Sequence, residues 1–174
     1  GANGDMNNVF KFAKVLMNNN VGRSFYMGGY GWYDTHGDQF NWLNRNLNFV
    51  STAVTNFFND VKNTQDVTIV IFSEFWRTNK TNWDLGTDHG DGGGMYVITS
   101  NAALRTKLQA GTYGNMSIKN AKYNSLGIWV DYRSVYGSIY NSLYGLNEST
   151  YFGTPISLMN DISTTPNDIS LLNY

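Results

Sequence analysis

A helical pattern between Asp38 and Val61 is the sequence feature that most limits how this chain can fold. Steps of three and four over about six turns predict an amphipathic helix. The residues on its apolar face are Phe40, Leu43, Leu47, Val50, Val54, Phe57, Phe58 and Val61. The next segment, 66–73, is almost continuously apolar and β-branched, which predicts a strand buried on both faces, as in a parallel sheet under helices.

Further predicted elements continue this alternation. Apolar spacing predicts helices over 5–17, 101–109 and 132–144, and short apolar runs predict strands over 24–27 and 95–99. Asp5, Asn101 and Asp131 are suited to begin the three helices. Because strands and helices alternate over short connections, we expect an α/β fold with a mostly parallel sheet. The 174 residues fit a single domain, and residues 153–174 read as an irregular tail.

The composition excludes several classes of function. A formal net charge of −1 gives no electrostatic basis for binding nucleic acid or an anionic membrane, and the chain has no cysteine for a disulfide framework or thiolate chemistry. No apolar run approaches the roughly 20 residues of a membrane-spanning helix. Charged residues make up only 14 % of a chain rich in Asn, Gly, Ser, Thr and Tyr. We expect an extracellular or periplasmic protein, with Gly1 either a processed end or a boundary.

Two histidines, each in a glycine-rich loop beside an aspartate, are the first candidates for a site. Asp34 and His36 follow one predicted strand, Asp88 and His89 occupy a later loop, and Glu74 follows the most buried strand. If the strands are parallel, these side chains meet at one sheet edge and suit Zn²⁺, Mn²⁺ or a similar cation. Each motif alone is also compatible with a capping turn or an ordinary loop.

Three ordered motifs resemble a known family. They are Gly-Trp-Tyr-Asp-Thr-His-Gly-Asp-Gln at 31–39, Phe-Ser-Glu-Phe-Trp-Arg-Thr at 72–78 and Gly-Thr-Asp-His-Gly at 86–90. Their order and spacing resemble the bacterial domain-of-unknown-function family 1501, which belongs with the alkaline phosphatase and sulfatase superfamily. The resemblance extends through 131–136 and covers about residues 9–152.

The resemblance implies a three-layer α/β/α fold with a divalent metal (Zn, Mn, Mg or Ca) at the strand ends. In the wider superfamily, two metals activate a Ser or Thr nucleophile against phosphate or sulfate esters. The positions that match the motifs as metal ligands are Asp34, His36, Glu74, Asp88 and His89. Arg77 is suited to bind a substrate anion through its planar fork, or to pair with Glu74.

This chain also departs from the family pattern. Family members are typically more than twice as long, and the half that carries the nucleophile has no counterpart here. Trp76 replaces a glycine, and Trp32-Tyr33 adds an aromatic residue before Asp34. We therefore expect a truncated, carboxyl-terminal portion of the fold that binds metal but is not catalytically complete alone.

Two other functions fit the sequence. One is a non-catalytic structural subunit of an extracellular filament or surface assembly, because an incomplete sheet leaves an edge or apolar face that must be covered. Its cover would be another copy of the chain or a missing amino-terminal segment. The other is a carbohydrate-binding module, suggested by exposed Trp and Tyr among many Asn residues.

Overall fold

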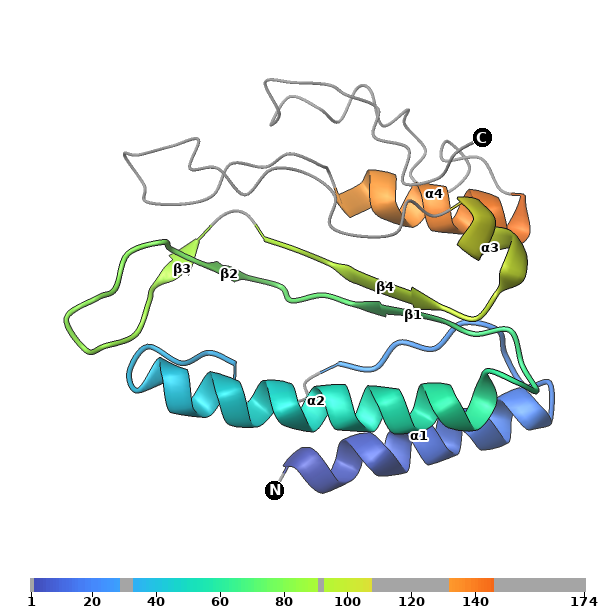
Figure 1. The fold of residues 1–174 in the computed structure, drawn as a ribbon, viewed down its shortest axis with the longest axis horizontal. Helices are drawn as coiled ribbons and strands as arrows, with labels where there is room; N and C mark the ends of the chain where they lie inside the picture. The colour runs from blue at the N-terminus through green and yellow to red at the C-terminus, as the bar shows by residue number, and fades with distance from the viewer. Residues whose placement is uncertain (1, 29–32, 91–92, 108–131, 146–174) are drawn as a thin grey trace. The chain divides into compact units, whose positions relative to one another are not determined.

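The computed structural model describes residues 2–28, 33–90, 93–107 and 132–145 (Figure 1). Their contacts divide the chain into two compact units. Unit 1 comprises residues 1–68 and 80–88, and unit 2 comprises residues 69–79 and 89–174. The predicted tail over 153–174 and the predicted cap Asp131 lie outside the described residues.

Unit 1 is built on two long helices, α1 (Ala2–Asn18) and α2 (Gln39–Val61). Figure 1 shows residues 21–28 running back alongside them, so that the helices run in the same direction. The rings of Phe10 and Phe57 stack with centroids 4.6 Å apart. The buried apolar residues on the two helices are Phe10, Ala13, Ala53, Val54, Phe57 and Val61. Both helices are confirmed, because the apolar spacing gives each helix a face to bury. The predicted cap Asp5 is wrong, since α1 begins at Ala2 and Asp5 lies inside it.

The predicted strand over 24–27 is wrong. These residues form no β-strand in the structure, and the side chain of Tyr26 is 83 % exposed. The run is only four residues long and alternates between exposed and half-buried positions. A strand prediction there rested on apolar character that the fold does not bury.

The described residues of unit 2 include four short strands in two sheets. β1 (Thr68–Ile71), which begins at the unit boundary, pairs with β4 (Tyr96–Thr99), and β2 (Trp76–Arg77) pairs with β3 (His89–Gly90). The β2–β3 pair is antiparallel, with Trp76 opposite Gly90 and Arg77 opposite His89. Figure 1 shows β4 running opposite to β1. The protein is thus mixed α and β.

The expected mostly parallel sheet of a three-layer α/β/α fold is therefore wrong for the described strands, which are antiparallel. A parallel pair requires a crossover of a dozen or more residues, usually through a helix. Here no described helix lies between β1 and β4, and the chain goes out through β2 and returns through β3. The strand is also less buried than predicted, since only Ile69 of β1 is buried.

Two helices complete the described part of unit 2, α3 (Ala102–Lys107) and α4 (Tyr132–Tyr144). The backbone N–H of Leu104 donates a hydrogen bond of 2.8 Å to Oδ1 of Asn101, which confirms the predicted cap. Leu104 is almost fully buried, as are Val135 and Ile139 of α4. This confirms the predicted apolar row of the last helix.

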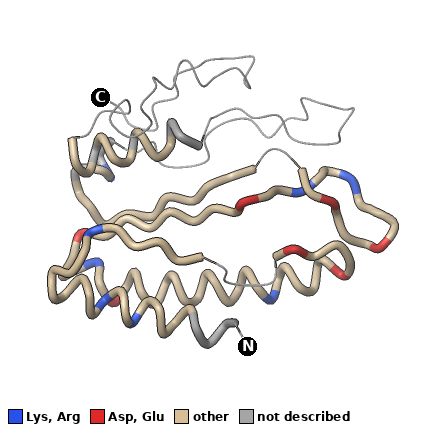
Figure 2. The backbone as a smooth tube through the Cα atoms, turned by 180° about the vertical axis from the view of Figure 1, so that it is seen from behind, with Lys and Arg blue, Asp and Glu red and all other residues tan. Residues whose placement is uncertain are grey.

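Charged residues are sparse along the backbone, and residues 74–88 carry charges of both signs (Figure 2). That stretch carries Glu74, Arg77, Lys80, Asp84 and Asp88. Acidic and basic side chains thus occur together there rather than as a run of one sign. In the part of the chain that the structure describes, no helix has the length and apolar character needed to cross a bilayer.

Candidate metal site

Asp34 and His36 lie together in the loop that leads into α2 of unit 1. Oδ1 of Asp34 is 3.4 Å from Nδ1 of His36, and both side chains are well exposed. Asp38 ends the loop in a left-handed conformation (φ 45°), and its carboxylate accepts a hydrogen bond of 2.7 Å from Nδ2 of Asn41. The carboxylate and the imidazole are therefore both accessible from solvent beside each other. In water an exposed pair of this kind contributes little to stability.

Asn82 connects this loop to Asp88 of the third motif, residues 86–90. Its Nδ2 donates hydrogen bonds to the backbone carbonyl of His36 (2.9 Å) and to Oδ1 of Asp88 (3.2 Å). Its Oδ1 accepts hydrogen bonds from the backbone N–H groups of Asp84 (3.0 Å) and Gly86 (2.9 Å). The same side chain thus closes its own turn and ties the turn to two predicted site residues.

Two glycines allow the loops to approach closely. Gly37 and Leu85 form an antiparallel bridge, and a Cβ added at Gly86 would overlap the carbonyl oxygen of His36. A Cβ at Gly37 would lie 2.6 Å from Oδ2 of Asp84. The overlap at Gly86 is with backbone, so the approach of the two loops requires glycine there, whereas the Asp84 carboxylate near Gly37 is the end of a side chain that can move aside. Within unit 1, the two motifs are docked through their backbones.

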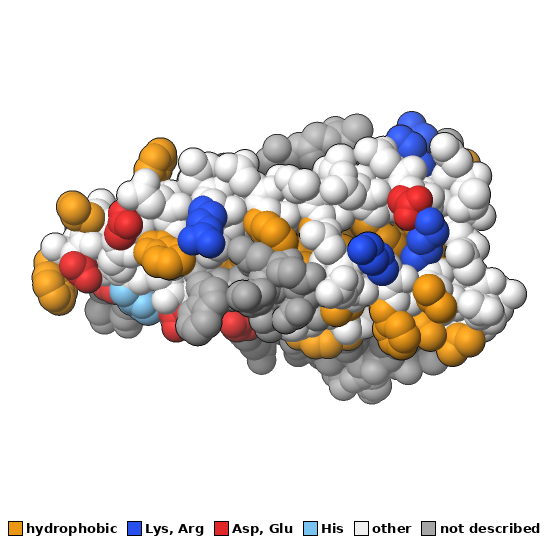
Figure 3. All heavy atoms as spheres, turned by 90° about the horizontal axis from the view of Figure 1, so that it is seen from below, with side chains coloured by type: hydrophobic (Ala, Val, Ile, Leu, Met, Phe, Trp, Pro, Cys, Tyr) orange, Lys and Arg blue, Asp and Glu red, His pale blue; other side chains and the backbone are white. Residues whose placement is uncertain are grey.

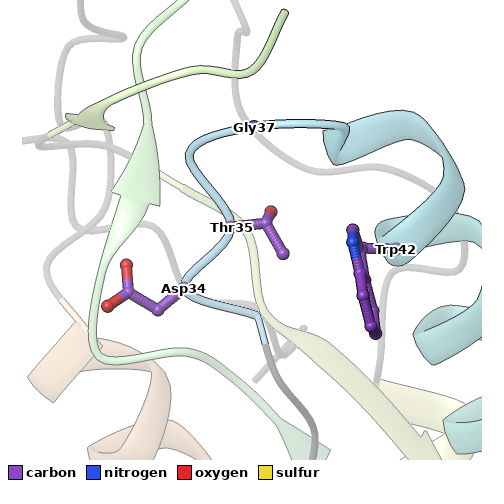
Figure 4. A pocket seen from close by; sticks show the side chains of 4 residues that line it. All are labelled: Asp34, Thr35, Gly37 and Trp42. Atoms are coloured by element: carbon purple, nitrogen blue, oxygen red, sulfur yellow. The ribbon is translucent and has the colours of Figure 1, made fainter. Parts of the chain in front are cut away.

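A pocket of about 460 Å³ opens beside the first loop and is lined by Asp34, Thr35, Gly37 and Trp42. Figure 4 shows the side chain of Thr35 directed toward the ring of Trp42, whereas the carboxylate of Asp34 points away from that ring. Oγ1 of Thr35 is buried and has no hydrogen-bond partner among the described residues. The guanidinium of Arg45 lies 5.9 Å from the centroid of the Trp42 ring.

Behind the loop, Tyr33 anchors it to α2. Its hydroxyl donates a hydrogen bond of 3.1 Å to the backbone carbonyl of Asn46, whose side chain is buried. Burial raises the pKa of the Tyr33 hydroxyl above its ordinary value of 10.0, because the charged phenolate is less well solvated there. The residue before Asp34 is thus held by the long helix.

The other predicted site residues belong to unit 2. The imidazole of His89 stacks on the ring of Phe75, with centroids 4.1 Å apart and planes 10° apart. The guanidinium of Arg77 lies 4.9 Å from the centroid of the same ring. Arg77 and His89 are also opposite each other in the β2–β3 pair. Glu74 is exposed, and its carboxylate accepts a hydrogen bond of 3.5 Å from the Ser73 hydroxyl.

The structure therefore divides the predicted residues between the two units. Unit 1 contains Asp34, His36 and Asp88; unit 2 contains Glu74, Arg77 and His89. We had expected parallel strands to bring these residues together, but the described strands are antiparallel. Asp34 and His36 meet because both lie in one short loop, and Asp88 is tied to His36 through Asn82.

Asn82 was not among the residues that the sequence predicted for the site. A signal was present, because Asn side chains commonly accept hydrogen bonds from backbone N–H groups two residues further along the chain. Asn82 stands two residues before Asp84 and four before Gly86. Its link to His36, however, spans 46 positions and cannot be read from local spacing.

The comparison with known families gives one match. The family described as "Protein of unknown function (DUF1501)" matches residues 11–132 of this chain. The chain belongs to the DUF1501 family. Neither the curated proteins nor the solved structures contain a significant match. The family resemblance of the three motifs is thereby confirmed.

The DUF1501 match contains every residue predicted for the site. It spans α2, both docked loops of unit 1 and the β2–β3 pair. The contact between the loops is therefore part of the matched region of this DUF1501 chain. The family's description assigns it no activity.

Proposed function

We propose that this DUF1501 chain binds a divalent metal ion in unit 1 through Asp34 and His36, with Asp88 as the candidate for a further ligand. The observation that supports this best is the pair of hydrogen bonds from Asn82, to the carbonyl of His36 and to the carboxylate of Asp88. Those bonds hold the loop of Asp34 and His36 against the segment that carries Asp88, within unit 1. Neither motif needs such a link if it is only a capping turn.

The chemistry of the donors favours Zn²⁺ or Mn²⁺ over Ca²⁺ or Mg²⁺. An imidazole nitrogen and a carboxylate oxygen 3.4 Å apart suit a borderline or imidazole-binding cation. Ca²⁺ and Mg²⁺ are bound mainly by oxygen ligands. Because both side chains are exposed, an ion from solution can reach them without a conformational change.

We further propose that the chain is the carboxyl-terminal portion of a secreted protein like the alkaline phosphatases and sulfatases. When bound, the metal would act as a Lewis acid toward a phosphate or sulfate oxygen. Within unit 2, Arg77 is suited to bind an anion of this kind, since Phe75 supports its guanidinium and a planar fork matches such oxygens. Binding rather than turnover is the activity we expect of this chain alone.

Isothermal titration with ZnCl₂ and MnCl₂ after chelator treatment tests this proposal. The wild-type chain should bind, and Asp34→Asn and His36→Ala should each weaken binding at least about tenfold. Asp60→Asn is the matched control, because Asp60 is also an exposed unit 1 carboxylate and only pairs with Lys14 at 2.6 Å. Absence of binding by the wild-type chain, or equal binding by all three variants, would contradict the proposal.

A second candidate is a self-associating structural subunit. Trp83 and Leu85 are 94 % and 79 % exposed. They lie on the turn that Asn82 closes through two hydrogen bonds from backbone N–H groups. Figure 3 shows hydrophobic side chains exposed at several places on one face of the molecule. Exposed aromatic residues on a rigid turn are suited to bind a second copy.

Light scattering over a range of protein concentrations tests self-association. The structural candidate is supported if the wild-type mass exceeds that of one chain, decreases in Trp83→Ser and is unchanged in Phe12→Ser. Phe12 is a suitable control because it is also exposed (62 %) but lies on α1. A monomeric mass at every concentration would rule this candidate out.

A further inference from the structure

We infer that Asn82 is a positioning residue for the metal site: its side-chain amide holds the backbone of His36 and the carboxylate of Asp88 in fixed places. This inference rests on the proposed metal binding, because positioning has meaning only for a site that binds. It adds a residue that the motifs did not indicate, at a position between the second and third motifs.

The hydrogen-bonding capacity of Asn82 is completely used. Its Oδ1 accepts two backbone N–H groups and its Nδ2 donates to two oxygens. An Asn side chain has two donor hydrogens and two acceptor lone pairs. No position is left for a ligand, so Asn82 acts on the site only through the groups that it holds.

The two oxygens that Nδ2 contacts belong to different motifs. The hydrogen bond to the carbonyl of His36 fixes the backbone from which the imidazole projects, two residues from Asp34. Oδ1 of Asp88 receives the other hydrogen, which orients that carboxylate. Partners of this kind, which hold a ligand without touching the metal, typically change metal affinity by about 10- to 100-fold when they are removed.

Other side chains cannot make the same set of bonds. Asp has no donor, Gln is longer by one methylene, and Ser has one hydroxyl that cannot reach both oxygens. The glycine contacts leave little freedom to adapt, because Gly86 lies directly against the carbonyl of His36. We therefore expect the loss of the amide to displace His36 and Asp88 relative to each other.

The experiment uses Co²⁺ as the probe, titrated into the chelator-treated full chain and followed by its visible d–d absorption, whose band shape reports the coordination geometry. Asn82→Ala should weaken Co²⁺ binding by about 10- to 100-fold and change the band shape. Asn41→Ala is the control, because Nδ2 of Asn41 also donates to a carboxylate of the same loop, that of Asp38. It should leave both the affinity and the spectrum unchanged.

Asn82→Ser separates positioning from folding. A Ser hydroxyl can still accept the N–H of Asp84 and keep the turn, but it cannot hold His36 and Asp88 together. Circular dichroism will show whether each variant is folded. A folded Asn82→Ser chain with weakened binding and an altered Co²⁺ spectrum supports the inference, including when Asn82→Ala does not fold.

The possible failures are distinguishable. If the wild-type chain binds neither Co²⁺ nor Zn²⁺, the proposed function is overturned and the positioning role with it. If the wild-type chain binds and Asp34→Asn does not, but folded Asn82→Ser matches Asn41→Ala in affinity and spectrum, only the role of Asn82 is overturned.

Discussion

The hydroxyl of Tyr33 donates a hydrogen bond of 3.1 Å to the backbone carbonyl of Asn46, in the second turn of α2. This contact places the residue that precedes Asp34 against the helix that forms the core of unit 1. It also removes part of the phenol from water, which raises its pKa above 10.0. The contact can therefore be tested through the pH dependence of stability.

Replacing Tyr33 with Phe should lower the free energy of unfolding by about 0.5–1.5 kcal/mol at neutral pH, through loss of one hydrogen bond. The folded chain holds the Tyr33 proton more tightly than the unfolded chain does. The protonated Tyr33 hydroxyl therefore stabilises the folded chain fully below pH 10.0, and this contribution is lost as the pH rises through the folded-state pKa of Tyr33. Urea unfolding of Tyr33→Phe should accordingly show a smaller loss of unfolding free energy at alkaline pH than the wild type.

Tyr26→Phe, at an exposed site, is the control and should retain the wild-type pH profile. Identical profiles for all three chains would contradict the assignment.

The docking of the loops predicts that Gly86→Ala destabilises unit 1. The added methyl would overlap the carbonyl of His36, and overpacking of this kind costs about 1–3 kcal/mol. Gly94→Ala is the matched change, because a Cβ there would lie 3.7 Å from the Trp76 ring, at ordinary contact distance. Guanidinium unfolding should show a loss for Gly86→Ala only. Equal midpoints for the two variants would show that the loops do not touch in this way.

The core between the helices predicts a large effect of Phe57→Ala. The ring of Phe57 is buried and stacks on Phe10 at 4.6 Å, and truncation of a buried Phe costs about 3–5 kcal/mol. Phe12→Ala should change the unfolding free energy by no more than about 0.5 kcal/mol, because Phe12 is exposed on the same helix as Phe10. Similar losses for the two variants would mean that α1 and α2 pack through other faces.

The left-handed backbone of Leu85 predicts that replacing this residue with glycine stabilises the protein. Its φ of 58° is left-handed, which is unfavourable for a residue with a Cβ, and its side chain is exposed. Leu85→Gly should raise the unfolding free energy by up to about 1 kcal/mol, after the greater flexibility of glycine in the unfolded chain is allowed for. Leu85→Ala keeps the Cβ and should give no such gain. A gain for both variants would attribute the effect to the exposed leucine side chain instead.

The helices were predictable because their signal is local. The apolar stripe of 38–61 yields α2, and the Asn101 cap and the row of Val135 and Ile139 yield α3 and α4. The spacing identifies only part of the buried face, because Val54, Phe57 and Val61 are buried. Phe40 and Leu47, on the same predicted face, are 80 % and 51 % exposed. The signal of β4 is local too, since this strand is predicted over 95–99 and found over Tyr96–Thr99.

Strand direction and the β2–β3 pair were not predictable in this way. The run 66–73 indicates a strand but says nothing of whether its partner is parallel, and β2 and β3 have only two residues each. Of the site, the pair Asp34 and His36 could be identified from its loop. The role of Asn82 could not, because it depends on where a distant carbonyl lies.

The link from Asn82 to His36 also orders events during synthesis of the chain. It joins positions 46 apart, with all of α2 between them. α2 forms from neighbouring residues, whereas closing so long a loop costs entropy before its contacts repay it. A nascent chain cannot pair these loops until Asp88 has left the ribosome. An ion that needs both loops would therefore enter a unit whose helices are already packed, rather than guide their assembly.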